Sequence, residues 1–314
     1  MIDNRLLARI AELHFIHGAS QYKIAEKFNF SKSKVCRIIK EAKDKGVIEF
    51  KIKNFDNRKI ELEKKIEDRY GLKEAIVYFN SDISKGDEQL VFQKVGNLGA
   101  EYIKRILRDN MNIAVTWGKT LYNVIKEIRT VKNYRINVFS TLGGVGLTRA
   151  EYQNNNLVKM LSDKIGGYHY QLYLPLILDK SKYKNLLQEE NSIMKVLGDI
   201  TKLDYYITSF GTVSTDSRMY KLGGFDRNFI KALTKKKVIG EIGLNFYDIE
   251  GNFISTKVGE KIVNIKIDDI KKIKNKIIIG FGKEKVKALK GLLETKIPDI
   301  LITDSITIES VLSD

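Results

Sequence analysis

Apolar residues recur at intervals of three and four in three short blocks near the start of the chain, which is the spacing of amphipathic helices. The blocks span residues 5–17, 21–28 and 32–45. Serines precede the second and third blocks as suitable N-caps, and Asn29 between them tolerates the left-handed backbone of a tight turn. The residues expected to face inward are Leu6, Ile10, Leu13, Ile16 or His17, Ile24, Ala25, Phe28, Val35, Ile38, Ile39 and Ala42.

A short turn between two close helices is typical of a helix–turn–helix, and Ala25 in the first of these helices permits the close crossing. After Gly46 the segment VIEFKIK alternates apolar and polar residues, which predicts a strand and one arm of a β-wing. Residues 1–53 are therefore predicted to form a winged helix–turn–helix domain. The charged segment that follows keeps a thin apolar stripe at helical spacing, so residues 54–72 are predicted to form a connector helix.

From residue 73 onward, short runs rich in Ile, Val and Leu alternate with helical patterns. Near-continuous apolar strands are typical of a mainly parallel sheet that helices cover on both faces. Residues 73–314 are therefore predicted to form one Rossmann-like α/β domain. The expected strands are residues 74–79, 112–117, 135–140, 170–175, 204–210, 276–282 and 299–304, and the expected helices are residues 87–108, 119–129, 153–165, 185–201, 226–235, 283–294 and 305–312.

Excess positive charge is concentrated in the first of these domains. The 314 residues include 55 Lys and Arg and 39 Asp and Glu, a formal net charge of +16. The first 60 residues hold 14 basic and 7 acidic side chains, whereas the other 254 hold 41 and 32. A basic module ahead of a nearly balanced domain is typical of nucleic-acid binding. A three-helix interaction domain with a solvated basic face is the structural alternative.

The third helix is the candidate recognition helix of this module. Side chains near the start of such a helix reach base edges, and Lys or Arg further along neutralise phosphates. Lys40 and Lys43 lie on the same outer face. The residues expected to contact operator DNA are Lys32, Ser33, Lys34 and Arg37 on the third helix, and Ser20 and Gln21 at the start of the second.

Composition excludes several other classes of protein. The one cysteine, Cys36, rules out an intramolecular disulfide and a Cys-rich zinc site, and we expect it to be a small, partly buried residue. Three histidines leave little for a His-based metal centre, so neither a metal nor a cofactor is expected. No run of about 18 apolar residues is present and the N-terminus lacks a signal-peptide core, so we expect a soluble, cytoplasmic protein without a membrane partner.

Glycine-bearing turns follow several of the expected strands, and ligands of parallel α/β sheets bind at this carboxyl edge. Hydroxyls and backbone N–H groups at a helix start, as in TWGKT, suit a phosphate. No turn matches the dinucleotide or P-loop motif, and a purely structural glycine is an even alternative at each turn. Gly211 is a candidate ligand contact in one of them. Together they predict a site for a small anion, and they lie at residues 116–120, 142–146, 209–212, 280–285 and 303–304.

The order and spacing of nine segments resemble the SorC-type family of sugar-binding transcriptional regulators, in the branch that includes the deoxyribonucleoside regulator. The resemblance covers nearly the whole chain. It implies a sugar-phosphate-isomerase-type effector domain, a phosphorylated sugar as inducer, operator DNA as partner, most often repression, and a homo-oligomer that is a dimer or a tetramer. The segments are SQYKIAEKFNFSKSKVCRIIKEAKDKGVIEFKI, LGAEYIKRIL, IAVTWGKTL, LGGVG, YLPLIL, SFGTVSTDSRMYKLGGF, VIGEIGLNFYDIEGN, GFGKEKVKAL and LITDSITIESVL.

Carried over residue by residue, the resemblance also implies roles for named positions. Leu142 stands where some relatives carry Lys or Arg before paired glycines, so a covalent Schiff base with an aldehyde sugar is impossible at this position. The implied phosphate contacts are Gly118, Lys119, Thr120 and Lys285, and the implied sugar contacts are Glu241, Gly143, Gly144 and Asn154 or its neighbours.

The alternative function is a sugar-phosphate isomerase or deaminase with an added DNA-binding domain. Such chemistry needs an acid and a base beside C1 and C2 of the sugar. The large domain has a single histidine, His169, in a segment where a strand or packing role is expected. Glu241 alone is weak support for acid–base catalysis, so we expect a regulator and no enzyme activity.

Overall fold

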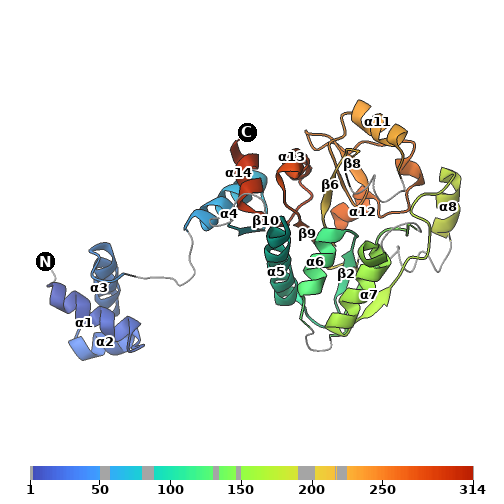
Figure 1. Ribbon diagram of the computed structural model, residues 1–314. Coiled ribbons are helices and arrows are strands. Elements are labelled where there is room, and N and C mark those ends of the chain that lie inside the picture. Colours follow the sequence, from blue (N-terminus) through green and yellow to red (C-terminus); the bar gives the residue numbers. More distant parts are fainter. Residues whose placement is uncertain are drawn as a thin grey trace. The chain divides into compact units, whose positions relative to one another are not determined.

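The structure, a computed structural model, consists of two compact units, Met1–Asp56 and Asn57–Asp314 (Figure 1). The connector helix α4 (Asn57–Tyr70) belongs to the larger unit, where it packs against the first strand and the last helix. The structure describes residues 3–49, 57–79, 88–129, 134–145, 150–189, 202–215, 217 and 225–313.

The smaller unit contains helices α1 (Asn4–Phe15), α2 (Gln21–Phe28) and α3 (Lys32–Asp44). Asn29 adopts φ 54° and ψ 44°, the left-handed conformation predicted for the turn between α2 and α3. This turn brings the Phe30 N–H to the Ala25 carbonyl at 2.8 Å. Each helix begins at a residue whose side chain accepts a backbone N–H of the first turn, and these caps are Asp3, Ser20 and Ser31.

The core of this unit follows the predicted spacing in α2 and α3 and differs from it in α1. Ile16 is 77% exposed because α1 ends at Phe15, and His17 is exposed as well, so the prediction that one of them faces inward is wrong. Leu7 and Ala11 take the buried positions instead. The buried residues of all three helices are Leu7, Ile10, Ala11, Ile24, Ala25, Val35, Ile38, Ile39 and Ala42.

Two further expectations concern the same unit. Cys36 is exposed, because it lies between the inward-facing positions of α3, so the expectation of partial burial is wrong. Residues 47–49 form no strand, and residues 50–53 of the expected wing lie outside the described residues.

Seven strands of the described residues form the central sheet of the larger unit, in the order β1-β10-β9-β5-β2-β3-β4. Every neighbouring pair is parallel, which confirms the predicted α/β class. The strands are β1 (Glu74–Tyr78), β2 (Asn112–Val115), β3 (Asn137–Ser140), β4 (Tyr168–Tyr170), β5 (Tyr205–Thr208), β9 (Asn275–Ile279) and β10 (Ile300–Asp304).

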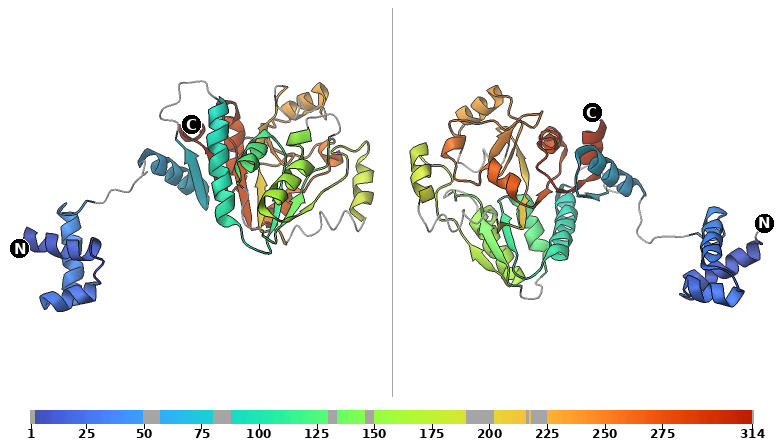
Figure 2. Two further views of the ribbon diagram at one scale, coloured as in Figure 1. Left: turned by 60° about the horizontal axis from the view of Figure 1, so that its bottom comes forward. Right: turned by 180° about the vertical axis from the view of Figure 1, so that it is seen from behind.

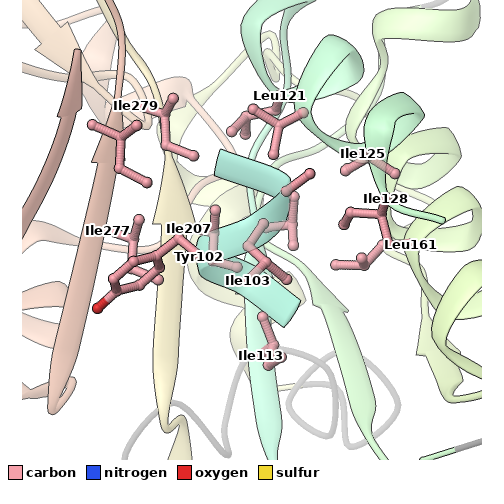
Figure 3. Packing of buried hydrophobic residues seen from close by; sticks show 14 of the residues in the cluster. Tyr102, Ile103, Ile113, Leu121, Ile125, Ile128, Leu161, Ile207, Ile277 and Ile279 are labelled. Carbon is pink, nitrogen blue, oxygen red and sulfur yellow. The ribbon is translucent and has the colours of Figure 1, made fainter. Parts of the chain in front are cut away.

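Helices cover both faces of this sheet (Figures 1 and 2). Successive residues of one strand enter opposite cores: Ile277 and Ile279 join one apolar cluster, shown in Figure 3, whereas Ile278 joins the other. This two-sided burial explains the nearly continuous apolar runs. The first cluster lies under α5 (Glu88–Ile106), α6 (Lys119–Glu127) and α7 (Asn154–Ile165), and the second under α4, α13 (Val286–Glu294) and α14 (Ser305–Ser313).

A second, antiparallel sheet was not predicted from the sequence. Its strands are β6 (Phe210–Thr212), β7 (Gly240–Ile242) and β8 (Asn245–Tyr247). The expected strand 204–210 is in fact two strands separated at Ser209, so β5 stays in the parallel sheet and β6 leaves it. With α11 (Arg227–Lys235), the small sheet encloses an apolar cluster around Phe229, Leu233 and Phe246. Strands of three residues are too short for a periodic pattern to reveal.

Among its described residues the larger unit also contains α8 (Ser181–Glu189), α12 (Ile267–Lys272) and the 3-10 turns η1 (Ala150–Tyr152), η3 (Gly259–Lys261) and η4 (Lys283–Lys285), the last of these ahead of α13. The expected strand 170–175 lies earlier, as β4. The expected helix 185–201 begins earlier, as α8, and residues 190–201 lie outside the described residues.

Carboxylates of α4 cap the outer edge of β1. Glu67 Oε1 accepts the Ala75 N–H at 2.7 Å, and Glu63 Oε1 accepts the Val77 N–H at 2.8 Å. These two N–H groups belong to the edge strand and face away from β10. The connector helix is therefore fixed to the sheet by hydrogen bonds as well as by the buried side chain of Ile66.

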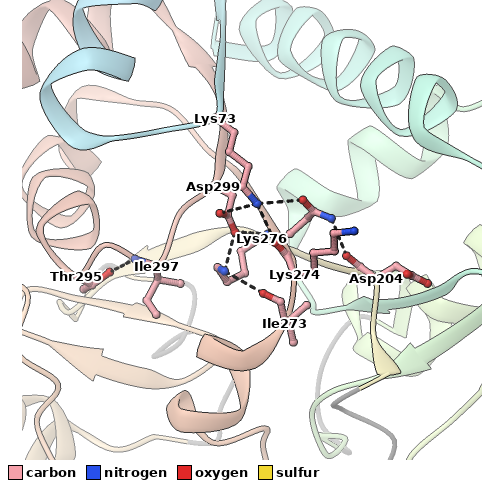
Figure 4. Close-up of polar contacts among 9 residues, drawn as sticks. Lys73, Asp204, Ile273, Lys274, Lys276, Thr295, Ile297 and Asp299 are labelled. Carbon is pink, nitrogen blue, oxygen red and sulfur yellow. Dashed lines mark hydrogen bonds and ion pairs between the residues drawn. The ribbon is translucent and has the colours of Figure 1, made fainter.

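An ion network joins β1, β9 and β10 where these strands begin (Figure 4). Asp299 lies between two lysines: Oδ2 is 2.7 Å from Lys276 Nζ, and Oδ1 is 3.0 Å from Lys73 Nζ. Lys276 is only 8% exposed and also donates to the Ile273 carbonyl.

We predict that Asp299→Ala lowers the free energy of unfolding by about 3 kcal/mol, because it leaves the buried Lys276 ammonium without its counter-charge. Urea unfolding followed by circular dichroism measures the loss. The matched control is Asp268→Ala, which removes an exposed partner of Lys271 at 3.5 Å and should cost less than about 0.5 kcal/mol. Equal losses in the two variants would contradict the role of Asp299.

Candidate functional site

The exposed face of α3 carries the side chains predicted to read DNA. Lys32, Ser33, Lys34 and Arg37 are all exposed, as are Lys40 and Lys43. Lys34 Nζ lies 3.8 Å from the centre of the Phe30 ring, so its chain is held against the turn by a cation–π contact. Arg37, one turn further along α3, projects from the same face. The helix thus presents a row of cations with few acidic neighbours.

The start of α2 contributes a second group of exposed residues. The Ser20 hydroxyl accepts the Lys23 N–H at 3.3 Å as the cap of α2, and Gln21 is half-buried. Tyr22 follows Gln21 and is 70% exposed, and it is not among the residues predicted from the sequence to contact DNA. An aromatic residue outside the inward-facing positions of a short helix was the available signal.

In the larger unit, the direction of chain progression reverses between two adjacent strands, β2 and β5. From β2 the chain proceeds through β3 to β4, whereas from β5 it proceeds through β9 to β10 on the other side. Ligands of open α/β sheets bind at such a switch point, beyond the carboxyl ends of the strands. The two loops meet there: a side chain at Gly118 would come within 3.7 Å of Ser209 Oγ. Thr116 and Thr208, one step earlier, share a buried hydroxyl–hydroxyl hydrogen bond of 2.9 Å.

Gly118 opens helix α6 in a conformation that favours glycine, with φ 113° and ψ 163°. Its N–H donates to the Tyr152 carbonyl at 3.0 Å, so this group is already committed to the scaffold. The first-turn N–H groups of α6 that follow have no acceptor within the helix and are the donors a phosphate would use. Thr120 is buried in this turn, and Lys119 Nζ lies 4.3 Å from the centre of the Phe92 ring on α5.

Glu241 is a buried carboxylate on β7. It is 7% exposed, and its Oε2 accepts the Leu244 N–H at 2.8 Å. Gly211 faces it across the β6–β7 pair, where any side chain would collide with Oε1, so this glycine makes room for the carboxylate. Burial raises the pKa of Glu241 to about 7, against the opposing effects of the Leu244 N–H and the Lys285 ammonium.

Lys285 lies at the end of η4 and is half-buried. Its Nζ is 5.5 Å from the centre of the Phe210 ring, and its charge lowers the pKa of Glu241, so the two side chains share one neighbourhood. Tyr206 and Tyr247 also lie near Glu241, and burial raises the pKa of both phenols. The structure thus brings Gly211, Glu241 and Lys285 together.

The paired glycines follow β3. At Gly143 a side chain would come within 2.5 Å of the Pro175 carbonyl oxygen, and its N–H donates to the Val263 carbonyl at 3.0 Å. Close backbone packing therefore requires glycine at this position. Gly144 is more open, although its N–H is bonded to the Leu174 carbonyl at 2.8 Å. Leu142 is buried in the cluster around Phe229.

Two other predicted positions are occupied by internal contacts. Asn154, the first residue of α7, is 3% exposed, and both polar atoms of its amide are hydrogen-bonded within the protein. His169 lies on β4, two strands from β2, with Nδ1 3.1 Å from Ser162 Oγ. Among the described residues, no group of three or more His, Cys, Asp or Glu could hold a metal ion. The described helices include none that is long and apolar enough to span a bilayer.

The raised pKa of Glu241 predicts a pH-dependent stability. Between pH 4.5 and about 7 the carboxyl of Glu241 has lost its proton in the unfolded chain and keeps it in the folded chain. The stability that this proton contributes is therefore complete below pH 4.5 and is lost as the pH rises to about 7. The loss is about 3 kcal/mol. The Gln side chain of Glu241→Gln cannot ionise. The free energy of unfolding of this variant should therefore rise by about this amount relative to the wild type between pH 4 and pH 8, as measured by urea unfolding. A difference that stays constant with pH would contradict the assignment.

The comparisons with known proteins agree with this architecture. A family model described as "Putative sugar-binding domain" matches residues 56–313. The deoxyribonucleoside regulator of Bacillus subtilis is 25% identical over 310 residues, which cover 99% of this chain and 98% of that protein. The sorbitol operon regulator of Klebsiella pneumoniae is 24% identical over 315 residues, which cover 99% and 98%.

The crystal structure of full-length SorC from Klebsiella pneumoniae is similar to this one with a TM-score of 0.75 and 22% identity, over 99% of both chains. This similarity shows that the fold is shared. The family match covers residues 57–313 of the larger unit and eight of the nine segments that carry the sequence resemblance, and the first segment, residues 20–52, lies before it. The chain therefore belongs to this sugar-binding domain family, and its predicted resemblance to SorC-type regulators is confirmed.

Proposed function

We propose that this chain is a transcriptional regulator of a carbohydrate-related operon, acting as a repressor, and that a phosphorylated sugar bound to the larger unit controls its DNA binding. Two relatives that match over nearly the full length are named deoxyribonucleoside regulator and sorbitol operon regulator, which supports the general role. The observation that carries the proposal is the exposed row of cations on α3, the second helix of a correctly capped helix–turn–helix.

The DNA-binding step follows from the geometry of that helix. In a helix–turn–helix, the first residues of the second helix reach base edges in the major groove. Exposure supports this proposed contact for four side chains of α3, and phosphate neutralisation for Lys40 and Lys43. The four are Lys32, Ser33, Lys34 and Arg37. Ser20, Gln21 and Tyr22 begin the preceding helix, where phosphate contacts are common in this motif. A two-fold oligomer would then bind a palindromic operator.

The sensing step uses the switch point of the parallel sheet. The phosphate of the effector would lie at the first turn of α6, where the helix dipole and unbonded N–H groups favour an anion. Lys285 would supply the matching charge, and Glu241 would bind sugar hydroxyls. For the effector to change DNA binding it must bind two states of the oligomer differently, and about 1.4 kcal/mol of difference shifts their ratio tenfold.

We further propose that the sugar phosphate is bound without turnover. Burial, and after it the nearby Glu241 charge, raise the pKa of the Tyr206 and Tyr247 phenols, which makes them poor bases at neutral pH. His169, on the edge strand β4, is hydrogen-bonded to Ser162. A sugar phosphate incubated with the protein should be recovered unchanged, and isomerisation that disappears in Glu241→Gln would favour the enzyme alternative.

Arg37→Ala should weaken operator binding by about 1–3 kcal/mol if the guanidinium reads a base. The measurement is a gel-shift titration on DNA fragments that the wild-type chain selects from a random library. Arg9→Ala is the matched control, because it removes the same charge from an exposed position on α1. If the two variants bind DNA equally well, Arg37 has no part in recognition.

Lys285→Ala should abolish the response to the effector while DNA binding without effector stays intact. A thermal-shift screen of pentose and hexose phosphates identifies the effector, since a ligand at a hundredfold excess over its Kd stabilises a protein by about 2.7 kcal/mol. Gel-shift titrations with and without that effector then measure the response. Lys287→Ala, an exposed lysine two residues along, is the control. A Lys285→Ala chain that still responds as the wild type does would disprove the phosphate assignment.

A further inference from the structure

The side chain of Asn154 makes five hydrogen bonds at the carboxyl edge of the parallel sheet. Its Oδ1 accepts the Thr141 and Leu142 N–H groups at 2.7 and 2.8 Å and the Ser140 hydroxyl at 2.7 Å. Its Nδ2 donates to the carbonyls of Val115 and Thr116 at 2.6 and 3.1 Å. Both N–H bonds of the amide are used and the oxygen has three donors, so no capacity remains for a ligand.

The partners of Asn154 belong to two different loops. Val115 and Thr116 end β2 and lead to Gly118 and the start of α6, whereas residues 140–142 end β3 and lead to the paired glycines. The amide orientation is unambiguous because one end faces backbone donors and the other faces backbone acceptors. The hydrogen bonds of the sheet stop where the strands end. One buried side chain at the start of α7 therefore holds the two loops that follow β2 and β3.

The residues just before Asn154 reinforce the same arrangement. The Tyr152 carbonyl accepts the Gly118 N–H at 3.0 Å, and Gln153 Nε2 donates to the Val145 carbonyl at 2.5 Å. Thr141 Oγ1 adds a direct link between the loops, because it donates to the Val115 carbonyl at 3.1 Å. The entry to α7 is thus bonded to both loops through three consecutive residues.

We propose that Asn154 is a positioning residue of the effector site: it does not touch the ligand, and it holds the loops after β2 and β3 in the geometry that ligand binding requires. This inference rests on the proposed function in taking these loops as the effector site. It replaces direct contact, the role that the family resemblance implied for Asn154, because a buried amide with every hydrogen bond made would have to lose a scaffold bond to bind a sugar.

The next residue provides a matched control. Asn155 also binds the backbone with both ends of its amide: its Oδ1 accepts the Leu172 N–H at 3.0 Å, and its Nδ2 donates to the Leu172 carbonyl at 3.0 Å. It has the same chemistry on the same helix turn, but the segment it holds follows β4 and is hydrogen-bonded to the loop after β3 at Gly144. Asn155→Ala therefore removes an amide bridge while the Asn154 bonds to Val115 and Thr116, ahead of Trp117, stay in place.

The chain contains its own reporter of loop order. Trp117 is the only tryptophan, is half-buried, and directly follows Thr116, whose carbonyl Asn154 binds. In the ligand-free full-length chain, Asn154→Ala should raise acrylamide quenching of Trp117 by about twofold, because local opening exposes the loop. Asn155→Ala should leave quenching at the wild-type value. Equal quenching in the two variants would overturn the proposal.

A second variant keeps the test decisive if Asn154→Ala does not fold. In Asn154→Asp, a protonated carboxyl can still accept at one oxygen and donate to the Val115 carbonyl from the other, whereas the ionised form would face two carbonyl oxygens. Quenching of Trp117 should therefore fall toward the wild-type value between pH 8 and pH 5, after subtraction of the wild-type pH profile. Quenching that does not change with pH would overturn the proposal. Neither quenching measurement needs a ligand. A failure of the sugar-phosphate assignment would appear in the thermal-shift screen and not in the quenching data, so it can be distinguished from a failure of this proposal.

Discussion

The requirement that a parallel sheet be buried on both faces governs the rest of the larger unit. Parallel neighbours cannot be joined by tight hairpins, so each connection must cross a face, and helices fill those faces with apolar side chains. Ile277, Ile278 and Ile279 illustrate the result, because adjacent residues of one strand belong to different cores. The same constraint places all the carboxyl ends of the strands at one edge, and every glycine-bearing turn discussed above leaves from that edge.

Hydrogen bonds and close backbone packing within the protein already engage several of the predicted ligand contacts at that edge. The Gly118 N–H is bonded to Tyr152, Gly143 is packed against the Pro175 backbone, and Asn154 is saturated. These positions shape the site without offering their polar groups to it. We propose that the first turn of α6, the ammonium of Lys285 and the carboxylate of Glu241, to which Gly211 gives space, recognise the charged ligand. A site of this kind gains its selectivity from a rigid frame and a few polar contacts.

The sequence pattern predicted the capped helices of the smaller unit and most of the parallel strands, because their signals are local. Caps at Ser20 and Ser31, the left-handed Asn29 and the buried face of α3 each depend on neighbours within a few residues. Prediction failed where the signal was short or depended on the ends of elements. Ile16 fell beyond the end of α1, the strand through Ser209 was two strands, and the small antiparallel sheet had only three residues in each strand.

The sequence by itself determined the class of the fold, the two-part division and the residue types available for chemistry, since periodicity, caps and charge are written along the chain. Only the tertiary structure decided what those residues do. It placed Gly211 opposite Glu241 across β6 and β7, and Lys285 near the same carboxylate although 44 positions separate Lys285 from Glu241 in the sequence. It also showed that Asn154 serves the scaffold. The physical reason is that hydrogen-bond saturation and burial depend on partners brought together by strand order, and strand order is not encoded in any local segment.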